Sequence, residues 1–217
     1  IMFGLPGGAA IPLFDALYQL KGKIKFVLTR HEQNAAHEAD GYARATGKPA
    51  AVLVTSGPGA ANTVTGIMTA YMDSVPMIVI TGQSVRGMLG KDAFQEADIF
   101  NLTMPIVKHS YLLKSANDIP RVVKEAYHIA TTGRPGPVLI DVPKDVGTEL
   151  CTAALDAEMN LPGYKPEKRG YLPETLDFIA DALAKAKRPV IIAGHGAALS
   201  RAEKELRELA EKLQIPV

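Results

Sequence analysis

The sequence predicts an α/β fold, a doubly wound parallel sheet, followed by a linker and the start of a second α/β domain. Short β-branched runs alternate with segments of helical length over residues 1–146, which is typical of strands joined by helical crossovers. These runs are continuously apolar rather than alternating. Continuous apolar runs are expected where helices cover both faces of a sheet.

Four buried strands and three helices are predicted in the first domain, residues 1–146. The predicted strands are Lys25–Thr29, Ala50–Thr55, Met77–Thr81 and Val138–Val142. The predicted helices are Glu32–Ala45, Ala60–Met72 and Asp118–Thr131. A further strand-like segment starts directly at Ile1, so we expect that earlier residues are missing and that any targeting peptide lies outside this sequence.

Residues 147–172 are predicted to be a linker, because prolines and glycines there interrupt any regular period. A partial central α/β domain is expected over residues 173–217, with a first helix behind Pro173. Its other predicted elements are a strand at Pro189–Ala193 and a helix opened by a Ser200–Glu203 capping box. One strand and two helices cannot form a sheet domain alone, so we expect the sequence to be truncated at Val217.

The composition, 47% hydrophobic and 22% charged, is that of an ordinary globular protein. The net charge is +1 and no basic stripe is interleaved with aromatic residues, which argues against nucleic-acid binding. The longest apolar runs have the length of strands, far below the roughly 20 residues of a membrane span. The single cysteine, Cys151, cannot form an internal disulfide. It fits a reducing compartment, so a cytoplasmic location is expected, or a plastid in a plant.

Glu32 stands where a predicted strand ends and a helix begins, the end of the strands at which open α/β sheets bind ligands. The neighbouring His31 suggests a zinc protease, but that motif needs a second histidine one helical turn later, and His37 lies six residues after His31. Zinc is disfavoured, and no metal ligand is predicted. The other interpretation of Glu32 is an acid in a first helical turn, which the helix dipole favours.

The turn Gly57-Pro58-Gly59 also joins a predicted strand to a predicted helix. It is close to a dinucleotide-binding fingerprint, but Asn62 replaces the third glycine and Asp73 comes too early to hold a ribose. A nucleophile elbow is excluded, because Val54 occupies the position that requires glycine.

Three segments, taken together, resemble the pyrimidine-binding domain of the thiamine-diphosphate enzymes. They are Phe3–Gly8, then Arg30–Glu32 running into Gly41–Gly47, then Thr55–Gly59. Further segments are most similar to the catalytic subunits of acetohydroxyacid (acetolactate) synthases: Asp92–Glu96, Lys108-His109, Gly133–Val138 and Val142–Val146. Glu32 argues against a glyoxylate carboligase, where an apolar residue takes its place. Phe94-Gln95 favours the flavin-containing branch over the catabolic, flavin-free acetolactate synthases.

This resemblance implies an enzyme that condenses 2-keto acids with loss of CO₂ in branched-chain amino-acid biosynthesis. Pyruvate is the implied donor, and pyruvate or 2-ketobutyrate the acceptor. The implied cofactors are thiamine diphosphate, FAD, and Mg²⁺ whose ligands lie on a C-terminal domain absent from this sequence. The resemblance also implies a homodimer or tetramer, with a possible regulatory subunit, and we expect the isolated 217-residue chain to be inactive.

The resemblance assigns roles to several residues. Glu32 is implied to activate the cofactor through a hydrogen bond to its aminopyrimidine ring, with Gly8, Gly57, Pro58 and Asn62 contacting the same ring. Phe94 and Gln95 are implied to line the substrate channel, Gln95 also taking part in catalysis, while Arg134 meets the flavin and Lys144 lies near the same groove. His195 is a further flavin contact on this view. Val85 departs from the family, which usually has proline there, so substrate preference stays open.

Other interpretations stay open at this stage. Within the superfamily, the protein could be a sulfoacetaldehyde acetyltransferase or a 2-keto acid decarboxylase. Outside it, the chain could be a nucleotide-binding module of an oxidoreductase, using Gly57–Asn62 or Gly194–Leu199. It could also be an inert interaction fragment.

Overall fold

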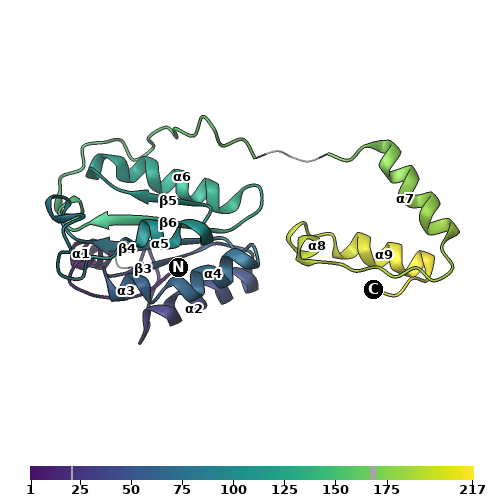
Figure 1. The fold of residues 1–217 in the computed structure, drawn as a ribbon, viewed down its shortest axis with the longest axis horizontal. Helices are drawn as coiled ribbons and strands as arrows, with labels where there is room; N and C mark the ends of the chain where they lie inside the picture. Colours follow the sequence, from purple (N-terminus) through teal and green to yellow (C-terminus); the bar gives the residue numbers. More distant parts are fainter. Residues whose placement is uncertain (21, 167–169) are drawn as a thin grey trace. The chain divides into compact units, whose positions relative to one another are not determined.

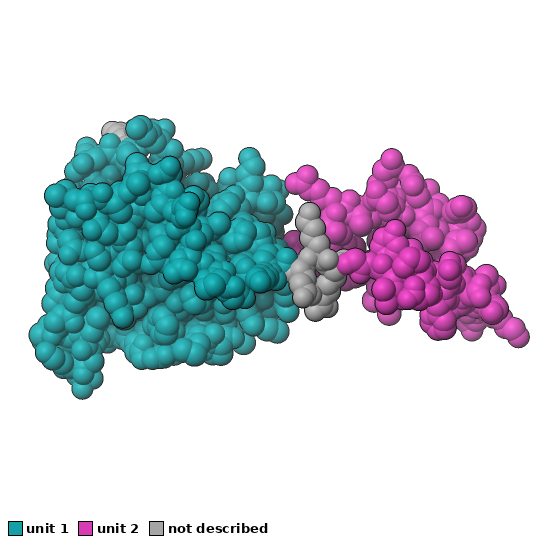
Figure 2. Space-filling model, turned by 90° about the horizontal axis from the view of Figure 1, so that it is seen from above, with its two compact units in different colours: residues 1–166 teal, residues 167–217 magenta. Residues whose placement is uncertain are grey.

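The computed structural model describes residues 1–20, 22–166 and 170–217. Figure 1 shows the fold of the chain, and Figure 2 distinguishes its two compact units, Ile1–Pro166 and Glu167–Val217. The first unit holds the sheet and every residue of the candidate site except His195.

A six-stranded parallel sheet forms the centre of the first unit. Its strands are β1 (Met2–Leu5), β2 (Phe26–Leu28), β3 (Ala50–Val54), β4 (Met77–Gln83), β5 (His109–Leu112) and β6 (Pro137–Pro143). They lie in the order β2-β1-β3-β4-β6-β5, and every neighbouring pair is parallel. The direction of strand addition reverses between β1 and β3, which places the ligand crevice of such a fold at the carboxyl ends of these strands.

Helices cover both faces of the sheet, so the doubly wound α/β fold is confirmed. The helices of this unit are α1 (Ile11–Gln19), α2 (Glu32–Thr46), α3 (Pro58–Ala61), α4 (Val64–Met72), α5 (Ile99–Thr103) and α6 (Ile119–Thr131). Short 3-10 turns lie at Arg86–Met88, Met104–Ile106, Ala116–Asp118 and Val146–Thr148. Figure 1 shows α6 on one side of the sheet and α2 and α4 on the other.

Each face of the sheet has its own apolar cluster. Because strand side chains alternate, Val138 and Ile140 of β6 pack toward α6, whereas Leu139 packs in the cluster of α2 and α4. The four alanines of α2, Ala35, Ala36, Ala39 and Ala43, are buried in that second cluster. An added Cβ on Gly66 of α4 would lie 2.4 Å from the Ala36 Cβ, so packing within this chain accounts for the small residues.

The second unit contains α7 (Pro173–Lys185), α8 (His195–Leu199) and α9 (Glu203–Leu213). The strand predicted at Pro189–Ala193 is wrong: these residues form no strand, and Ile192 is 94% exposed. Ile191 N donates to Pro216 O at 2.9 Å. A β-branched run becomes a strand only when neighbouring strands complete its ladder, and none does so among the described residues.

The predicted Ser200–Glu203 capping box is also wrong. The N-cap of α9 is Ala202, with no side-chain hydrogen bond, and the Ser200 hydroxyl donates instead to the carbonyls of Gly196 and Ala197. The helix predicted over Ala60–Met72 is interrupted: α3 ends at Ala61 and α4 begins at Val64.

Part of the predicted linker packs on the first unit. Leu161 and Tyr164 contact the apolar cluster under α6, and the Tyr164 hydroxyl lies 3.1 Å from Lys108 Nζ. Lys108 Nζ also donates to the carbonyls of Ile129 and Thr132, where α6 ends, as expected for a cation at a helix C-terminus. Residues 167–169 of the predicted linker lie outside the described residues.

None of the helices in residues 1–20, 22–166 and 170–217 combines the length and apolar character that a bilayer crossing requires. The same residues contain no group of three or more His, Cys, Asp or Glu side chains arranged to hold a metal ion.

Candidate active site

Glu32 is the first residue of α2, and its carboxylate is buried, with 9% of the residue exposed. The extended N-cap residue His31 accepts a hydrogen bond from Gln33 N through Nδ1 at 3.1 Å, so α2 begins at a fixed point. The helix dipole stabilises a carboxylate there. Asn62 Nδ2 donates to Glu32 Oε2 at 3.0 Å. Two predicted site residues, 30 positions apart in sequence, are therefore in direct contact.

The glycine turn after β3 faces this carboxylate. An added Cβ on Gly59 would lie 3.1 Å from Glu32 Oε1 and 2.7 Å from the Thr55 methyl group. Gly57 has φ +57°, a left-handed conformation that favours glycine, and Pro58 begins α3 directly after it. Glycine at position 59 thus leaves room for the Thr55 methyl group and the Glu32 carboxylate.

The same turn touches the loop that carries Phe94 and Gln95. An added Cβ on Gly57 would lie 2.6 Å from the Gln95 carbonyl oxygen. Gln95 and Asp92 both have positive φ, 53° and 54°, a backbone strain typical of functional loops. Glu96 holds the loop, accepting hydrogen bonds from the backbone of Ala93 and Gly90 that lower the pKa of its carboxyl.

A cavity of about 230 Å³ opens at the carboxyl ends of the strands. Four predicted residues line it: Gly8, Phe94, Gln95 and Lys144. Val85 lines it too, as do Ala9, Ser56, Gln83 and Ser84. Phe94 is 88% exposed, and an added Cβ on Gly8 would meet no atom within 4 Å. Packing within this chain therefore does not require glycine at position 8.

Sequence analysis did not single out Asp141, a carboxylate of β6 that is only 1% exposed and lines a separate cavity of about 290 Å³ together with Glu96 and Asp98. Its Oδ1 accepts from Thr81 Oγ1 at 2.7 Å and its Oδ2 from Gln83 Nε2 at 2.9 Å. Burial raises the pKa of Asp141 to about 7, the two hydrogen bonds oppose the rise, and the charge of Asp98 adds to it. The sequence did offer one sign of this residue, because Asp141 is the single acidic residue in the apolar run Pro137–Pro143.

Arg134 lies away from the other predicted residues. It precedes β6, and its guanidinium donates to Ser74 Oγ at 2.7 Å and to the Met72 carbonyl at 3.1 Å, both at the C-terminal end of α4. Lys144 follows β6 at the opposite end, and seven strand residues span roughly 20 Å. Arg134 and Lys144 thus line separate cavities in this unit, not the single groove that was expected. His195, in the second unit, is the first residue of α8.

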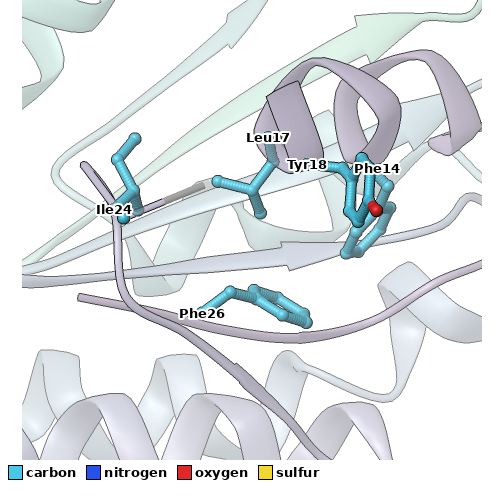
Figure 3. Close-up of a pocket in the computed structure, with 6 residues that line it drawn as sticks. Phe14, Leu17, Tyr18, Ile24 and Phe26 are labelled. Atoms are coloured by element: carbon cyan, nitrogen blue, oxygen red, sulfur yellow. The ribbon is translucent and has the colours of Figure 1, made fainter. Parts of the chain in front are cut away.

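A second cavity, of about 340 Å³, lies between α1 and β2 at the edge of the sheet. Figure 3 shows the side chains of Phe14, Leu17, Tyr18, Ile24 and Phe26 around it. Its lining residues include no carboxylate, histidine, lysine or arginine among those that the structure describes. The candidate active site is the cavity lined by Ser56, Gln95 and Lys144, together with the Glu32 carboxylate that faces the adjoining glycine turn.

Two sequence families match this chain. The family described as the thiamine pyrophosphate enzyme N-terminal TPP binding domain matches residues 1–102, and the thiamine pyrophosphate enzyme central domain matches residues 176–217. Glu32, Asn62, Gln83 and Gln95 all lie in the first matched region.

Whole-chain comparisons agree with these matches. The chain is 50% identical to an acetolactate synthase of Arthrospira platensis and 52% identical to the acetolactate synthase large subunit of Lactococcus lactis. Each comparison covers all of this chain but only 38% and 37% of the relative. The chain is thus similar to somewhat more than a third of each relative.

A solved structure is similar over the whole chain. Benzoylformate decarboxylase from Polynucleobacter necessarius superimposes with a TM-score of 0.84 at 27% sequence identity, over 100% of this chain and 39% of that one. The two matched domains and the similar solved structure agree: the chain carries the N-terminal TPP binding domain and part of the central domain of the thiamine pyrophosphate enzymes.

Proposed function

We propose that this chain is part of an acetolactate synthase, which joins two 2-keto acids with loss of CO₂ by means of thiamine diphosphate. The observation that carries the proposal is the buried Glu32 carboxylate. Its Oε2 accepts a hydrogen bond from Asn62, and its Oε1 faces Gly59. Identities of 50–52% to acetolactate synthases support the choice of reaction.

The residues around Glu32 fit the aminopyrimidine ring of thiamine diphosphate. No described residue donates a hydrogen bond to Glu32 Oε1, so this oxygen can accept one from a protonated ring nitrogen. Gly59 leaves room for the Glu32 carboxylate itself, and Gly8, where an added Cβ would meet no atom within 4 Å, leaves open space at the cavity. When bound, thiamine diphosphate supplies the nucleophilic carbon and the electron sink for decarboxylation. Glu32 orients the ring and exchanges a proton at Oε1, in a partly dry site that strengthens such a bond.

The substrate side of the site is assigned to the 230 Å³ cavity. Lys144 offers a positive charge to the carboxylate of a 2-keto acid, Gln95 offers an amide, and Phe94 forms an apolar wall. Pyruvate is the proposed donor, and pyruvate or 2-ketobutyrate the acceptor.

The proposal extends to the rest of the enzyme. FAD is a further cofactor, with Arg134 as its contact in this chain, since Arg134 is exposed and its Nη1 has no hydrogen-bond partner among the described residues. Mg²⁺ and the diphosphate belong to residues beyond this sequence. We further propose a homodimer or tetramer, a possible regulatory subunit, and a cytoplasmic location, or a plastid in a plant.

The test is the substitution Glu32→Gln in the complete enzyme. The amide keeps the shape but cannot exchange a proton, so we expect acetolactate formation from pyruvate to fall roughly 100-fold or more, with weaker thiamine-diphosphate binding. The matched control is Glu38→Gln, an exposed glutamate on the same helix, which should keep normal activity. Normal activity and cofactor affinity in Glu32→Gln would contradict the proposal.

A second candidate is a 2-keto acid decarboxylase, because the similar solved structure is a benzoylformate decarboxylase. Product analysis of the unaltered complete enzyme with pyruvate alone separates the two activities. We expect acetolactate. Acetaldehyde without acetolactate would favour the decarboxylase.

A further inference from the structure

An ion-pair cluster lies directly beside the cavity. Val85 and Lys144 both line the cavity, and the residues that follow them, Arg86 and Asp145, form an ion pair with 2.7 Å between Arg86 Nε and Asp145 Oδ2. The backbone N of Arg86 donates to the other carboxylate oxygen at 3.0 Å. Asp145 therefore holds both the side chain and the backbone of the residue after Val85.

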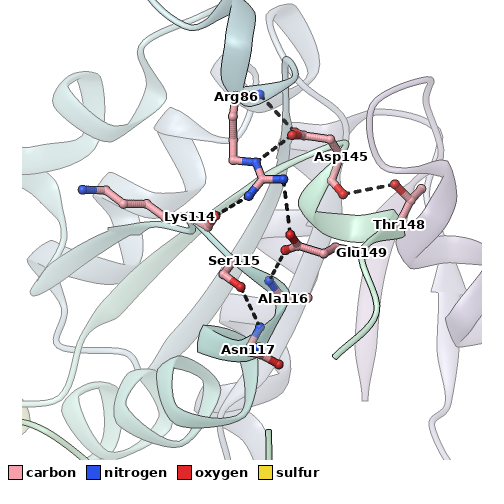
Figure 4. Close-up of polar contacts among 8 residues, drawn as sticks. All are labelled: Arg86, Lys114, Ser115, Ala116, Asn117, Asp145, Thr148 and Glu149. Carbon is pink, nitrogen blue, oxygen red and sulfur yellow. Dashed lines mark hydrogen bonds and ion pairs between the residues drawn. The ribbon is translucent and has the colours of Figure 1, made fainter. Parts of the chain in front are cut away.

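Arg86 also reaches two other segments. Its Nη1 donates to the carbonyl of Lys114 at 2.6 Å, just after β5, and its Nη2 lies 3.4 Å from Glu149 Oε1. Glu149 in turn accepts from Ala116 N at 2.7 Å. Figure 4 shows the guanidinium between these partners. One side chain thus joins the segments that follow β4, β5 and β6.

The charges of this cluster are stable around neutral pH. Partial burial alone would raise the pKa of Asp145, but hydrogen bonds from the Arg86 side chain and backbone hold it below the ordinary value. The Asp145 hydrogen bond raises the pKa of Arg86. The planar guanidinium suits this role, because lysine cannot donate in several fixed directions at once.

Both ends of the loop that carries Phe94 and Gln95 are held by Gln83. Its Oε1 accepts from Ser84 N at 2.8 Å, and its Nε2 donates to the Ala97 carbonyl at 2.8 Å. Between these ends, the described contacts to β6 and its extension run through Arg86 and Asp145. The Gln83 carbonyl accepts from Lys144 N at 3.0 Å. Arg86 and Asp145 add a second attachment one residue beyond Val85, and the two together hold Val85 relative to Lys144.

We propose that Arg86 is a positioning residue which, through Asp145, sets the spacing of Val85 and Lys144 and so the choice of acceptor 2-keto acid. This inference rests on the proposed function. The acceptor must fit between a wall that carries Val85 and the cation of Lys144, and a single methylene group in such a pocket changes discrimination by a measurable factor. If Val85 is held less firmly, we expect the site to accept pyruvate and 2-ketobutyrate more equally.

The test uses Arg86→Lys in the complete enzyme. Lysine keeps the positive charge but cannot make the several guanidinium hydrogen bonds of Arg86. Amide hydrogen exchange in residues 84–97 should therefore speed up about tenfold. With mixed pyruvate and 2-ketobutyrate, the preference between the two condensation products should move roughly threefold toward unity. The KM for the acceptor should change more than kcat.

The matched control is Arg44→Lys. Arg44 also bridges two carboxylates, and its side chain is 36% exposed against 39% for Arg86, but it lies at the end of α2 and lines no part of the cavity. The Arg44→Lys variant should leave both the hydrogen exchange of residues 84–97 and the ratio of the two condensation products unchanged. Unaltered exchange in Arg86→Lys, or faster exchange with an unaltered product ratio, would overturn the inference. Failure of the unaltered enzyme to form acetolactate would instead overturn the proposed function. Hydrogen exchange in Arg86→Lys and Arg44→Lys would still test whether Arg86 holds residues 84–97 in place.

Discussion

Glycine at position 59 leaves room for the Glu32 carboxylate, which makes this position a sharp test of the site. In Gly59→Ala the new methyl group would lie 2.7 Å from the Thr55 methyl and 3.1 Å from Glu32 Oε1. We expect a loss of roughly 1–3 kcal/mol in the free energy of unfolding. Activity of the complete enzyme should fall as well, because the carboxylate is displaced.

A double variant separates these two effects. Thr55→Ser removes the clashing methyl group but keeps the hydroxyl, which accepts from Ala9 N at 3.2 Å. Thr55→Ser with Gly59→Ala should therefore regain stability in urea unfolding without regaining activity. Joint recovery of both would show that the Glu32 contact is unimportant.

Asp141 predicts a pH dependence of stability. Its folded pKa of about 7 lies above the ordinary 3.8, so between these values the folded chain holds a proton that the unfolded chain has lost. Stability from this group is fully present below about pH 4 and falls as pH rises to about 7. In Asp141→Asn that fall is absent. From pH 5 to pH 8 the variant should gain roughly 2–3 kcal/mol relative to the unaltered chain.

Urea unfolding of both chains at the two pH values measures this difference. Asparagine can still accept from Gln83 and donate to Thr81 if the threonine hydroxyl turns, so the variant should fold. Asp98→Asn is the control, because Asp98 raises the pKa of Asp141 by its charge and its capping of Asn101 N can be kept by an amide. The Asp98→Asn variant should lose less stability between pH 5 and pH 8 than the unaltered chain. An equal stability difference at pH 5 and pH 8 would contradict the assignment.

At the scale of elements, the central strands of the sheet were predictable from their apolar runs, whereas β5 and α1 were not. Ala50–Thr55, Met77–Thr81 and Val138–Val142 each contain a central strand, because both faces of the sheet are covered there and the runs are apolar. Lys25–Thr29 also contains a strand, the edge strand β2, although β2 has no buried residue. The edge strand β5, His109–Leu112, begins with the polar pair His109-Ser110. Helix α1 contains no buried residue. Neither gives the pattern of a buried element.

The candidate site divides in the same way. Glu32 and the turn at Gly57 drew attention by their place at strand ends, whereas the roles of Asn62, Gly8, Gln95 and Lys144 are implied by the resemblance and stay predictions. The contacts of Asp141 with Gln83, and of Arg86 with Asp145, join residues 58 and 59 positions apart. Such pairs depend on the register of β4 against β6, which a sequence pattern does not provide.

At the scale of the whole molecule, the first unit depends on the segment after β6. Asn160 N donates to Glu125 Oε1 at 2.6 Å, and Glu125 is only 1% exposed. Tyr164 bonds Lys108 and Thr132 at the end of α6. Removing this segment would leave a buried carboxylate with one donor fewer and expose apolar surface under α6.

Two truncations of the chain test this dependence. A chain ending at Pro166 should unfold cooperatively in urea, because it contains one complete compact unit. A chain ending at Val146 should be less stable by roughly 3–5 kcal/mol, since it loses the donor to Glu125 and the packing of Leu161 and Tyr164. Within the longer chain, Tyr164→Phe removes only the hydroxyl contacts and keeps the ring against His128, so it should cost about 1 kcal/mol. Equal stability of the two truncated chains would mean that residues 147–166 form a linker without a role in the fold.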